Sequence, residues 1–152
     1  MLFDLRLPSI DTWRFDFDAE GWTEGGLSDL KAVWGAVTFT TTSADPQITS
    51  PITYLDCRLY PRIRVRMRAM PVDGRPKSAT GQVFWSTVDK RMDEAASASF
   101  AVPLDGLWHV HEIELRGNPN WTGRTDRIRL DPVDAAGVRV EVDEIGFVRS
   151  GN

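Results

Sequence analysis

The sequence has one cysteine, Cys57, in 152 residues, and this scarcity excludes two kinds of stabilisation. A lone cysteine cannot form an intramolecular disulfide, and it cannot supply a cysteine cluster for a structural metal. Long apolar runs are also missing, because the hydrophobic stretches fall far short of the roughly 18 residues that a membrane span requires. We therefore expect no membrane insertion, and we expect packing, with or without an ion, to stabilise the fold.

The N-terminus lacks the features of a secretion signal. Asp4 and Arg6 interrupt the segment that would have to be apolar, and no basic leader or small-residue cleavage site is present. We therefore expect synthesis in the cytoplasm without a signal peptide. The formal net charge of −4 disfavours general affinity for nucleic acid, although residues 58–77 carry seven basic side chains against one acidic side chain.

Motifs that would indicate catalysis are missing as well. The chain has no GxSxG nucleophile motif, no phosphate-binding loop and no HExxH zinc motif. His109 and His111 would share one face of a strand, but no third metal ligand follows at an informative spacing, so coincidence is the simpler interpretation. We therefore expect that the protein is not an enzyme.

The chain instead has the pattern of β-strands. Pro and Gly recur at short intervals, and apolar residues repeat with period two rather than the helical period of about 3.6. Residues 12–18 alternate apolar and polar side chains, as a half-buried strand does. Residues 32–42 are rich in β-branched and aromatic side chains and predict another strand, with Gly35 as a bulge or a point of close approach.

Residues 61–70 (PRIRVRMRAM) form the most informative predicted strand. Ile63, Val65 and Met67 would lie on one face, because successive side chains of a strand point to opposite sides. The other face would carry four arginines: Arg62, Arg64, Arg66 and Arg68. Further strands are expected in five segments: residues 81–88, 97–102, 107–115, 126–130 and 138–148.

In the last of these segments, residues 138–148, the alternation of apolar and polar side chains is interrupted once. The apolar positions of this segment switch faces between Val142 and Ile145, which predicts a β-bulge near Asp143 and Glu144. About nine short strands without intervening helices favour an all-β fold, and we expect an antiparallel β-sandwich of two sheets.

Several short motifs occur in a set order from residue 12 to residue 148. They are WRFDFDAEGW, VWGAVTF with ADPQITSP, RIRVRMR, GQVFWST, PLDGLWHVHEIEL, NWTGRTDRIRLDPV and VEVDEIGF. Through the order and spacing of these motifs, the chain resembles the β-sandwich domains of the galactose-binding-like superfamily, which includes many carbohydrate-binding modules. The resemblance implies a non-catalytic jelly roll with ligands at loops on one end or across the concave face. We expect this domain at residues 12–149, after an N-terminal arm at residues 1–11.

Three arginines of the predicted strand are candidate ligand-binding residues: Arg64, Arg66 and Arg68. Successive guanidinium groups on one strand face would lie about 6–7 Å apart, and unpaired they would repel one another. One interpretation is a cationic surface for an acidic glycan or a phosphate group, since a guanidinium group binds a carboxylate through two hydrogen bonds. The alternative is cross-strand pairing with carboxylates of the same period: Glu112, Glu114, Glu141 and Asp143. A mixture also stays open, with the inner arginines paired and one or two free at a rim.

Six tryptophans are many for this length, and exposed aromatic rings are typical of glycan sites, where they stack on the C–H face of a sugar. Trp85, near Gln82, and Trp121, in a polar loop, are the candidates for ligand binding. Burial is the alternative for both tryptophans, because this residue most often contributes buried area. Trp13 and Trp34 lie in strongly apolar segments, which predicts core positions. Two others flank turns and fit either role: Trp22 and Trp108.

A structural calcium ion is the one cofactor that we expect. Asp16 and Asp18 near the start and Asp143 near the end are candidate ligands, because this cation takes six to eight oxygen ligands at one place. The resemblance implies such an ion between the first and last strands. No EF-hand spacing is present, and carboxylates on exposed turns are usually only solvated, so both interpretations stay open.

These features predict a non-catalytic β-sandwich that binds a glycan, which could be an acidic polysaccharide. Because neither a signal nor a catalytic domain accompanies it, we expect an attachment component on the surface of a phage or phage-like particle, beside other particle proteins or further copies of itself. Two alternatives stay open. One is a structural virion decoration or assembly protein without sugar binding, and the other is an accessory module of a polysaccharide-degrading system.

Overall fold

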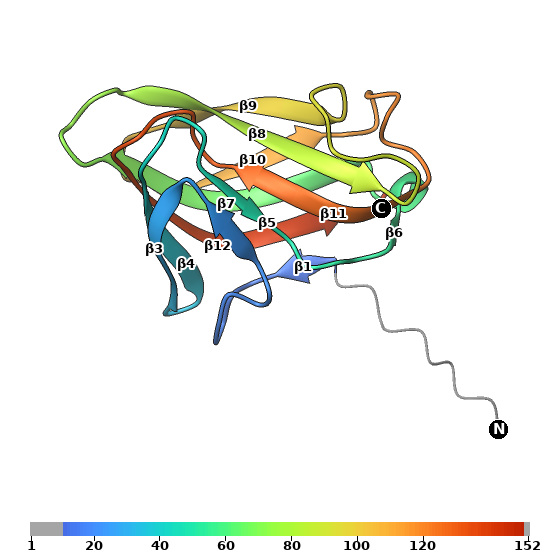
Figure 1. The fold of residues 1–152 in the computed structure, drawn as a ribbon, viewed down its shortest axis with the longest axis horizontal. Coiled ribbons are helices and arrows are strands. Elements are labelled where there is room, and N and C mark those ends of the chain that lie inside the picture. The colour runs from blue at the N-terminus through green and yellow to red at the C-terminus, as the bar shows by residue number, and fades with distance from the viewer. Residues whose placement is uncertain (1–10, 151–152) are drawn as a thin grey trace.

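The two-sheet sandwich expected from the sequence is confirmed by the computed structural model, which describes residues 11–150. Two six-stranded antiparallel sheets lie one behind the other in Figure 1. A short 3-10 helix, η1 (Cys57–Leu59), lies among the loops. Among the described residues, no helix combines the length and the apolar character that a membrane crossing needs. The predicted arm at residues 1–11 lies, apart from Asp11, outside the described residues.

Sheet A contains the strand with the alternating arginines, β7, which lies between β10 and β12. Its six strands are β1 (Thr12–Trp13), β3 (Leu27–Val33), β4 (Ala36–Thr41), β7 (Arg62–Pro71), β10 (His109–Glu114) and β12 (Val138–Val148). The spatial order is β10-β7-β12-β4-β3, and β1 also pairs with β12. The first and last strands of the described chain are therefore joined in one sheet.

Sheet B is the nearer layer in Figure 1. Its six strands are β2 (Thr23–Gly25), β5 (Gln47–Thr49), β6 (Leu55–Asp56), β8 (Ser78–Thr87), β9 (Ser97–Pro103) and β11 (Arg124–Asp131). The spatial order is β2-β5-β11-β8-β9, and β6 also pairs with β11. The described chain thus forms twelve strands rather than about nine, because short strands at the sheet edges, such as β2 and β6, give little signal in the sequence.

The core lies between the sheets and is filled by the inward positions of both. The predicted alternation of β7 is confirmed, since Ile63, Val65 and Met67 are buried while the arginines between them face outward. Trp13 is also buried, as the sequence predicts. Burial of such side chains contributes about 25 cal/mol for each Å² of apolar surface removed from water, which makes this layer the main source of stability.

The predicted β-bulge in β12 is confirmed. The pairing of β12 with β7 changes register between Val142 and Glu144, which leaves Asp143 as an extra residue. Val142 and Ile145 are both buried although they are three positions apart. The bulge therefore lets both halves of β12 turn their apolar side chains inward.

Residues 32–42 differ from the single strand that the sequence predicts. β3 ends at Val33 and β4 begins at Ala36, and the turn between them consists of Trp34 and Gly35 with φ angles of 54° and 79°. Gly35 is thus a turn glycine, a role that its positive φ requires, and not a bulge. Trp34 is 99% exposed, so the predicted core position is wrong, because a hairpin tip cannot reach the space between the sheets.

The segment at residues 12–18 also forms less strand than expected. Only β1 pairs within it, and Phe15, although buried, has a φ of 55° that ends the extended conformation. Phe17 lies beyond this point and is 96% exposed. The turn that carries Phe17 approaches the β3–β4 turn, since a carboxylate oxygen of Asp16 lies within 3.9 Å of the Cβ position at Gly35.

Candidate functional site

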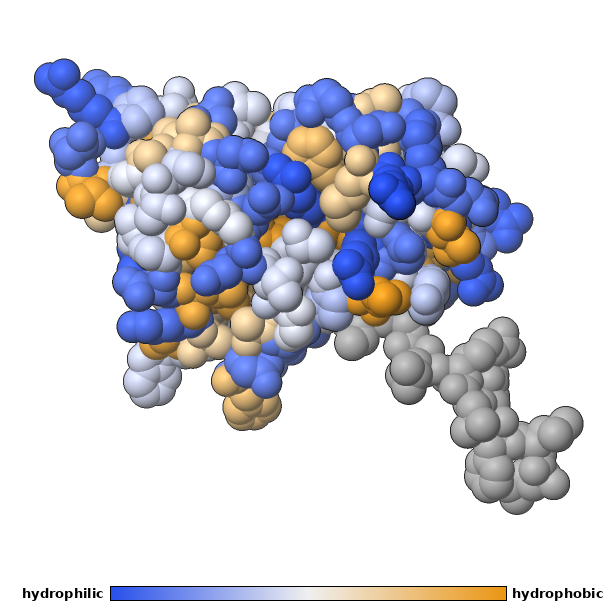
Figure 2. All heavy atoms as spheres, in the orientation of Figure 1, coloured by the Kyte–Doolittle hydropathy of each residue, from blue (hydrophilic) through white to orange (hydrophobic). Residues whose placement is uncertain are grey.

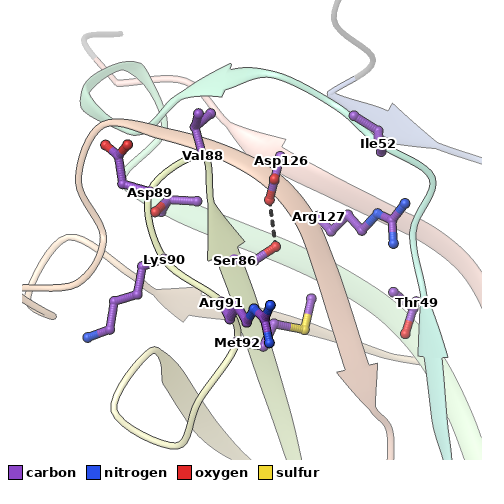
Figure 3. Close-up of a pocket in the computed structure, with 11 residues that line it drawn as sticks. Thr49, Ile52, Ser86, Val88, Asp89, Lys90, Arg91, Met92, Asp126 and Arg127 are labelled. Carbon is purple, nitrogen blue, oxygen red and sulfur yellow. Dashed lines mark hydrogen bonds between the residues drawn. The ribbon is translucent and has the colours of Figure 1, made fainter.

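The outer face of sheet B is hollowed beside the ends of β8 and β11 (Figure 3). The pocket has a volume of about 580 Å³, within the range of about 300–1,000 Å³ that is typical of small-molecule sites. Its lining comes from three strands and the segment after β8: Thr49, Ile52, Ser86, Thr87, Val88, Asp89, Lys90, Arg91, Met92, Asp126 and Arg127. Figure 2, which views this side of the molecule, shows many hydrophilic side chains with hydrophobic ones between them.

Paired strands fix the polar groups at the base of the pocket. Ser86 on β8 lies opposite Arg127 on β11 in the antiparallel register. The Ser86 hydroxyl donates to Asp126 Oδ1 at 2.5 Å. Figure 3 shows Arg127 extending from β11 toward the segment that carries Thr49 and Ile52. Because these side chains start from hydrogen-bonded strands, the backbone positions from which they reach into the pocket are set before any ligand arrives.

The segment after β8 forms the opposite wall and is held by hydrogen bonds. Thr87 and Lys90 exchange backbone hydrogen bonds of 2.8 and 3.2 Å, which closes a tight turn. The Lys90 ammonium group donates to Asn120 Oδ1 at 3.0 Å. The side-chain amides of Asn118 and Asn120 donate to the carbonyl oxygen of Ala95 at 2.9 and 3.1 Å. This wall is therefore tied to the loop before β11.

Two guanidinium groups in the lining have no partner among the described residues. Arg91 and Arg127 are exposed, and neither forms an ion pair or a side-chain hydrogen bond within that part of the chain. Asp89 and Asp126 add carboxylates to the same lining. The pocket therefore offers both donors and acceptors to a ligand.

A more enclosed polar cluster lies farther along the same face. Arg129 donates to the two oxygens of Asp131, at 2.7 and 2.8 Å, and to Asp45 at 3.1 Å. Its guanidinium group lies 4.8 Å from the centre of the Phe84 ring. Burial raises the pKa of Asp131 despite the opposing effect of Arg129, and hydrogen bonding with Asp131 raises the pKa of Arg129. Arg129 is thus engaged by the fold itself.

Three of the four arginines of β7, on the outer face of sheet A, are also engaged. They contact carboxylates of neighbouring strands: Arg64 with Glu112 and Glu144, Arg66 with Asp143, and Arg68 with Glu141. Arg62 forms no ion pair with the described residues, and its Nε has no hydrogen-bond partner among them. The shortest Arg64–Glu112 distance is 3.0 Å. Burial raises the pKa of Asp143, although Arg66 opposes the shift. The structure therefore shows cross-strand pairing for Arg64, Arg66 and Arg68 and leaves Arg62, at the start of the strand, outside these pairs.

The two tryptophans predicted to stack on a ligand are buried. Trp85 is 0% and Trp121 is 7% exposed, and their rings meet edge to face at 5.3 Å. Their indole N–H groups donate to the carbonyl oxygens of Asn120 and Tyr60 at 3.0 and 2.8 Å. Neither ring is available to a sugar, which corrects the prediction, because the register of β8 points Trp85 into the core and Trp121 packs against it.

Gln82 lies on the outer face of sheet B, away from the two buried rings. Its amide group donates to Glu94 at 2.8 Å and to Ser97 at 2.9 Å. Gln82 does not line the pocket. Gln82 and Trp85, which the sequence suggested as parts of one ligand site, therefore do not form one.

The candidate calcium ligands are not brought together. Within residues 11–150, no three or more His, Cys, Asp and Glu side chains are grouped so that they could hold a metal ion. Asp143 pairs with Arg66, and Asp18 accepts a hydrogen bond of 2.7 Å from the backbone N–H of Glu20. Calcium binding stays a prediction from the sequence.

Sequence reasoning missed Arg91 and Arg127 as pocket residues. Arg127 carries a usable signal, because the segment DRIRL places it on the solvent side with Arg129, while Ile128 and Leu130 point inward. Arg91 carries none, because it lies in an irregular segment whose path depends on hydrogen bonds to a distant loop.

Comparison with solved structures shows which proteins share this fold. A variant of CBM29-2, a family 29 carbohydrate-binding module, complexed with cellulohexaose matches with a TM-score of 0.58 at 9% identity, over 84% of this chain and 80% of that chain. A CBM29-2 variant complexed with mannohexaose matches with a TM-score of 0.58 at 8% identity, over 92% of each chain. The structure of PfGH50B matches with a TM-score of 0.67 at 11% identity. That match covers 95% of this chain and 24% of PfGH50B.

These matches establish the fold. No protein-family model matches the chain, and no curated protein matches its sequence. The chain has the jelly-roll β-sandwich of carbohydrate-binding modules, as the resemblance in its sequence implied. Since unrelated functions share such folds, the function has to be argued from the site.

Proposed function

We propose that this protein is a non-catalytic glycan-binding domain and that the pocket on the outer face of sheet B is its binding site. The observation that carries the proposal is the pocket of about 580 Å³, in which polar groups on paired strands adjoin apolar side chains. The shared fold supports it by analogy, because neighbours of this fold are carbohydrate-binding modules in complex with hexasaccharides.

The lining suits a sugar, which presents hydroxyl groups at its edges and C–H groups on its faces. Arg91 and Arg127 can donate hydrogen bonds to sugar oxygens, and Asp126 can accept from hydroxyl groups. Ile52 and Met92 supply the apolar contact for a C–H face. Because carboxylates and guanidinium groups are mixed around the pocket, a neutral glycan fits better than a highly charged one.

Arg127 provides the sharpest test of the site. A charge-assisted hydrogen bond is worth about 1.5–3 kcal/mol, so Arg127→Gln should weaken binding by about 10–100-fold. Since Arg127 is exposed and has no partner in the described chain, the melting temperature should not change. Isothermal titration calorimetry measures the affinity, with cellulohexaose, mannohexaose and the best ligands from an array of bacterial polysaccharides.

Arg75→Gln is the matched control, because Arg75 is an exposed arginine on the loop between β7 and β8. It should bind as the wild type does. The proposal is refuted if no glycan on the array binds, or if Arg127→Gln and Ser86→Ala both bind as tightly as the wild type. A negative array would favour the alternative of a structural protein without a sugar ligand.

The narrower role in attachment of a phage-like particle stays a prediction from the sequence. It requires the protein to be present on purified particles, which mass spectrometry of a particle preparation would detect. An antibody against the domain should then reduce adsorption of the particle to cells. Absence of the protein from the particles would leave the proposed sugar binding intact and remove the particle role.

A further inference from the structure

A second groove crosses the outer face of sheet A, on the other side of the sandwich. It has a volume of about 220 Å³, and its lining includes Trp34, Arg68, Trp108, Arg139 and Glu141. Trp108 precedes β10 at one edge of the sheet, and Trp34 joins β3 to β4 at the other. The two tryptophans therefore reach the groove from opposite edges, with β7 and β12 between them.

The Trp108 ring is held in place by arginines. The guanidinium carbons of Arg66 and Arg68 lie 4.5 and 4.9 Å from its centre, which is the geometry of a cation–π contact. Asp143 and Glu141 pair with these two arginines in turn. The indole is thus fixed on the sheet before a ligand binds, so little entropy is lost when it becomes a contact surface.

Trp34 has no role in the core that would explain it. Its side chain is 99% exposed at the tip of a two-residue turn, although tryptophan is usually highly buried. Phe17, on the neighbouring turn, is 96% exposed but does not line the groove. Of these two highly exposed rings, Trp34 is therefore the one that lies at the groove.

Arg139 supplies an uncommitted positive charge in the same groove. Arg68 is paired with Glu141, whereas Arg139 is exposed and has no ion pair or side-chain hydrogen bond in the part of the chain that the structure describes. A guanidinium group in this position can bind a carboxylate through two parallel hydrogen bonds. The lining thus combines two indole rings with a guanidinium group, that of Arg139, that residues 11–150 leave unpaired.

We propose that this groove is a second glycan site, selective for a sugar residue that carries a carboxylate. The indoles of Trp34 and Trp108 contact the C–H faces of the sugar, and Arg139 binds its carboxylate. This inference goes beyond the proposed function, because it assigns a different ligand class to the opposite face. A domain with both sites would bridge two glycan chains, or two parts of one chain, and gain avidity.

Titration of the ¹⁵N-labelled protein with hexagalacturonate tests the site. The indole N–H signals of Trp34 and Trp108 should shift, and those of the buried Trp85 and Trp121 should not. Trp34→Ala should weaken binding of hexagalacturonate by about tenfold through loss of stacking, and Arg139→Gln by about tenfold or more through loss of the charged pair. Higher salt should also weaken this binding.

Two exposed residues serve as matched controls, Phe17→Ala for the aromatic ring and Arg75→Gln for the charge. Both should bind hexagalacturonate as the wild type does. Equal weakening by Arg139→Gln and Arg75→Gln would show general attraction of charge and overturn the inference. The inference would also be overturned if the NMR chemical-shift changes were confined to residues of the sheet B pocket, or if hexagalacturonate did not bind. Binding of neutral glycans that depends on Arg127 would survive these outcomes, which separates this inference from the proposed function.

Discussion

The two outer faces of the sandwich are built from the same kind of alternating strands, yet they differ in how their arginines are paired with carboxylates. On sheet A, three arginines of β7, Arg64, Arg66 and Arg68, pair with carboxylates of neighbouring strands. On sheet B, Arg129 is enclosed by carboxylates, while Arg127, two positions away on β11, faces a pocket and has no partner within residues 11–150. The number of charges on a face therefore says little about binding, and the charges that the fold leaves unpaired say more.

The pairs on the two faces also differ in burial. The Arg129–Asp131 pair is 23% and 11% exposed, whereas the Arg68–Glu141 pair is 43% and 21% exposed. Water screens the second pair more than the first, and the penalty for leaving one partner alone grows with burial. The same substitution should therefore have unequal effects on the two faces.

The largest effect is expected beneath the sheet B face. Trp85→Ala empties a fully buried site under β8 and should lower the free energy of unfolding by about 3–5 kcal/mol. Trp34→Ala, on the exposed side of sheet A, should change it by less than about 0.5 kcal/mol. Urea denaturation followed by fluorescence and circular dichroism measures both. A large loss for Trp34→Ala would mean that this ring is structural, which would weaken its assignment to a binding groove.

A smaller effect should separate the two arginine pairs. Arg129→Met leaves Asp131 buried without its cation and should lower the free energy of unfolding by about 1–3 kcal/mol. Arg68→Met removes an exposed pair and should cost about 0–1 kcal/mol. Methionine keeps the length of the side chain, so packing on the sheet is largely retained. Equal losses in urea denaturation would show that the two faces do not differ in the way proposed.

The smallest effect is a difference in pH dependence. Burial raises the pKa of Asp131 above its ordinary value of 3.8, so just above that value the folded state binds more protons than the unfolded state. The free energy of unfolding from this group therefore falls as pH rises through that range. Arg129 opposes the shift, so in Arg129→Met the deficit against wild type should shrink as pH falls from about 7 toward about 4. A deficit that stays constant with pH would contradict the buried position of Asp131.

Much of the fold was predictable because alternation along a strand records which side faces the core. In β7 every second side chain is apolar, and the buried set is the predicted one. The bulge in β12 was predictable for the same reason, since a change of parity within an apolar strand requires an extra residue. Pairing of Arg64, Arg66 and Arg68 was predicted only as one of several alternatives, because the sequence does not show which strands become neighbours.

The tryptophans show where this reasoning fails. Polar neighbours in the sequence suggested exposure of Trp85 and Trp121, but burial depends on strand register and on loop packing from a distant segment. Apolar neighbours suggested burial of Trp34, but two residues with positive φ place it at a hairpin tip. The pocket lies between Arg127 on β11 and the segment that follows β8, and no local pattern in the sequence indicates that these two segments are neighbours.

The bulge in β12 also bears on how the sheet A face can evolve. Loss of the codon for Asp143 would restore simple alternation and leave Val142 and Ile145 pointing inward, with Glu144 still opposite Arg66 in the register. The core would keep its composition, while the face would lose one negative charge and the present partner of Arg66. A single deletion at this point can therefore shift the charge of the sheet A face by one unit toward positive, without any change in the buried side chains of β12.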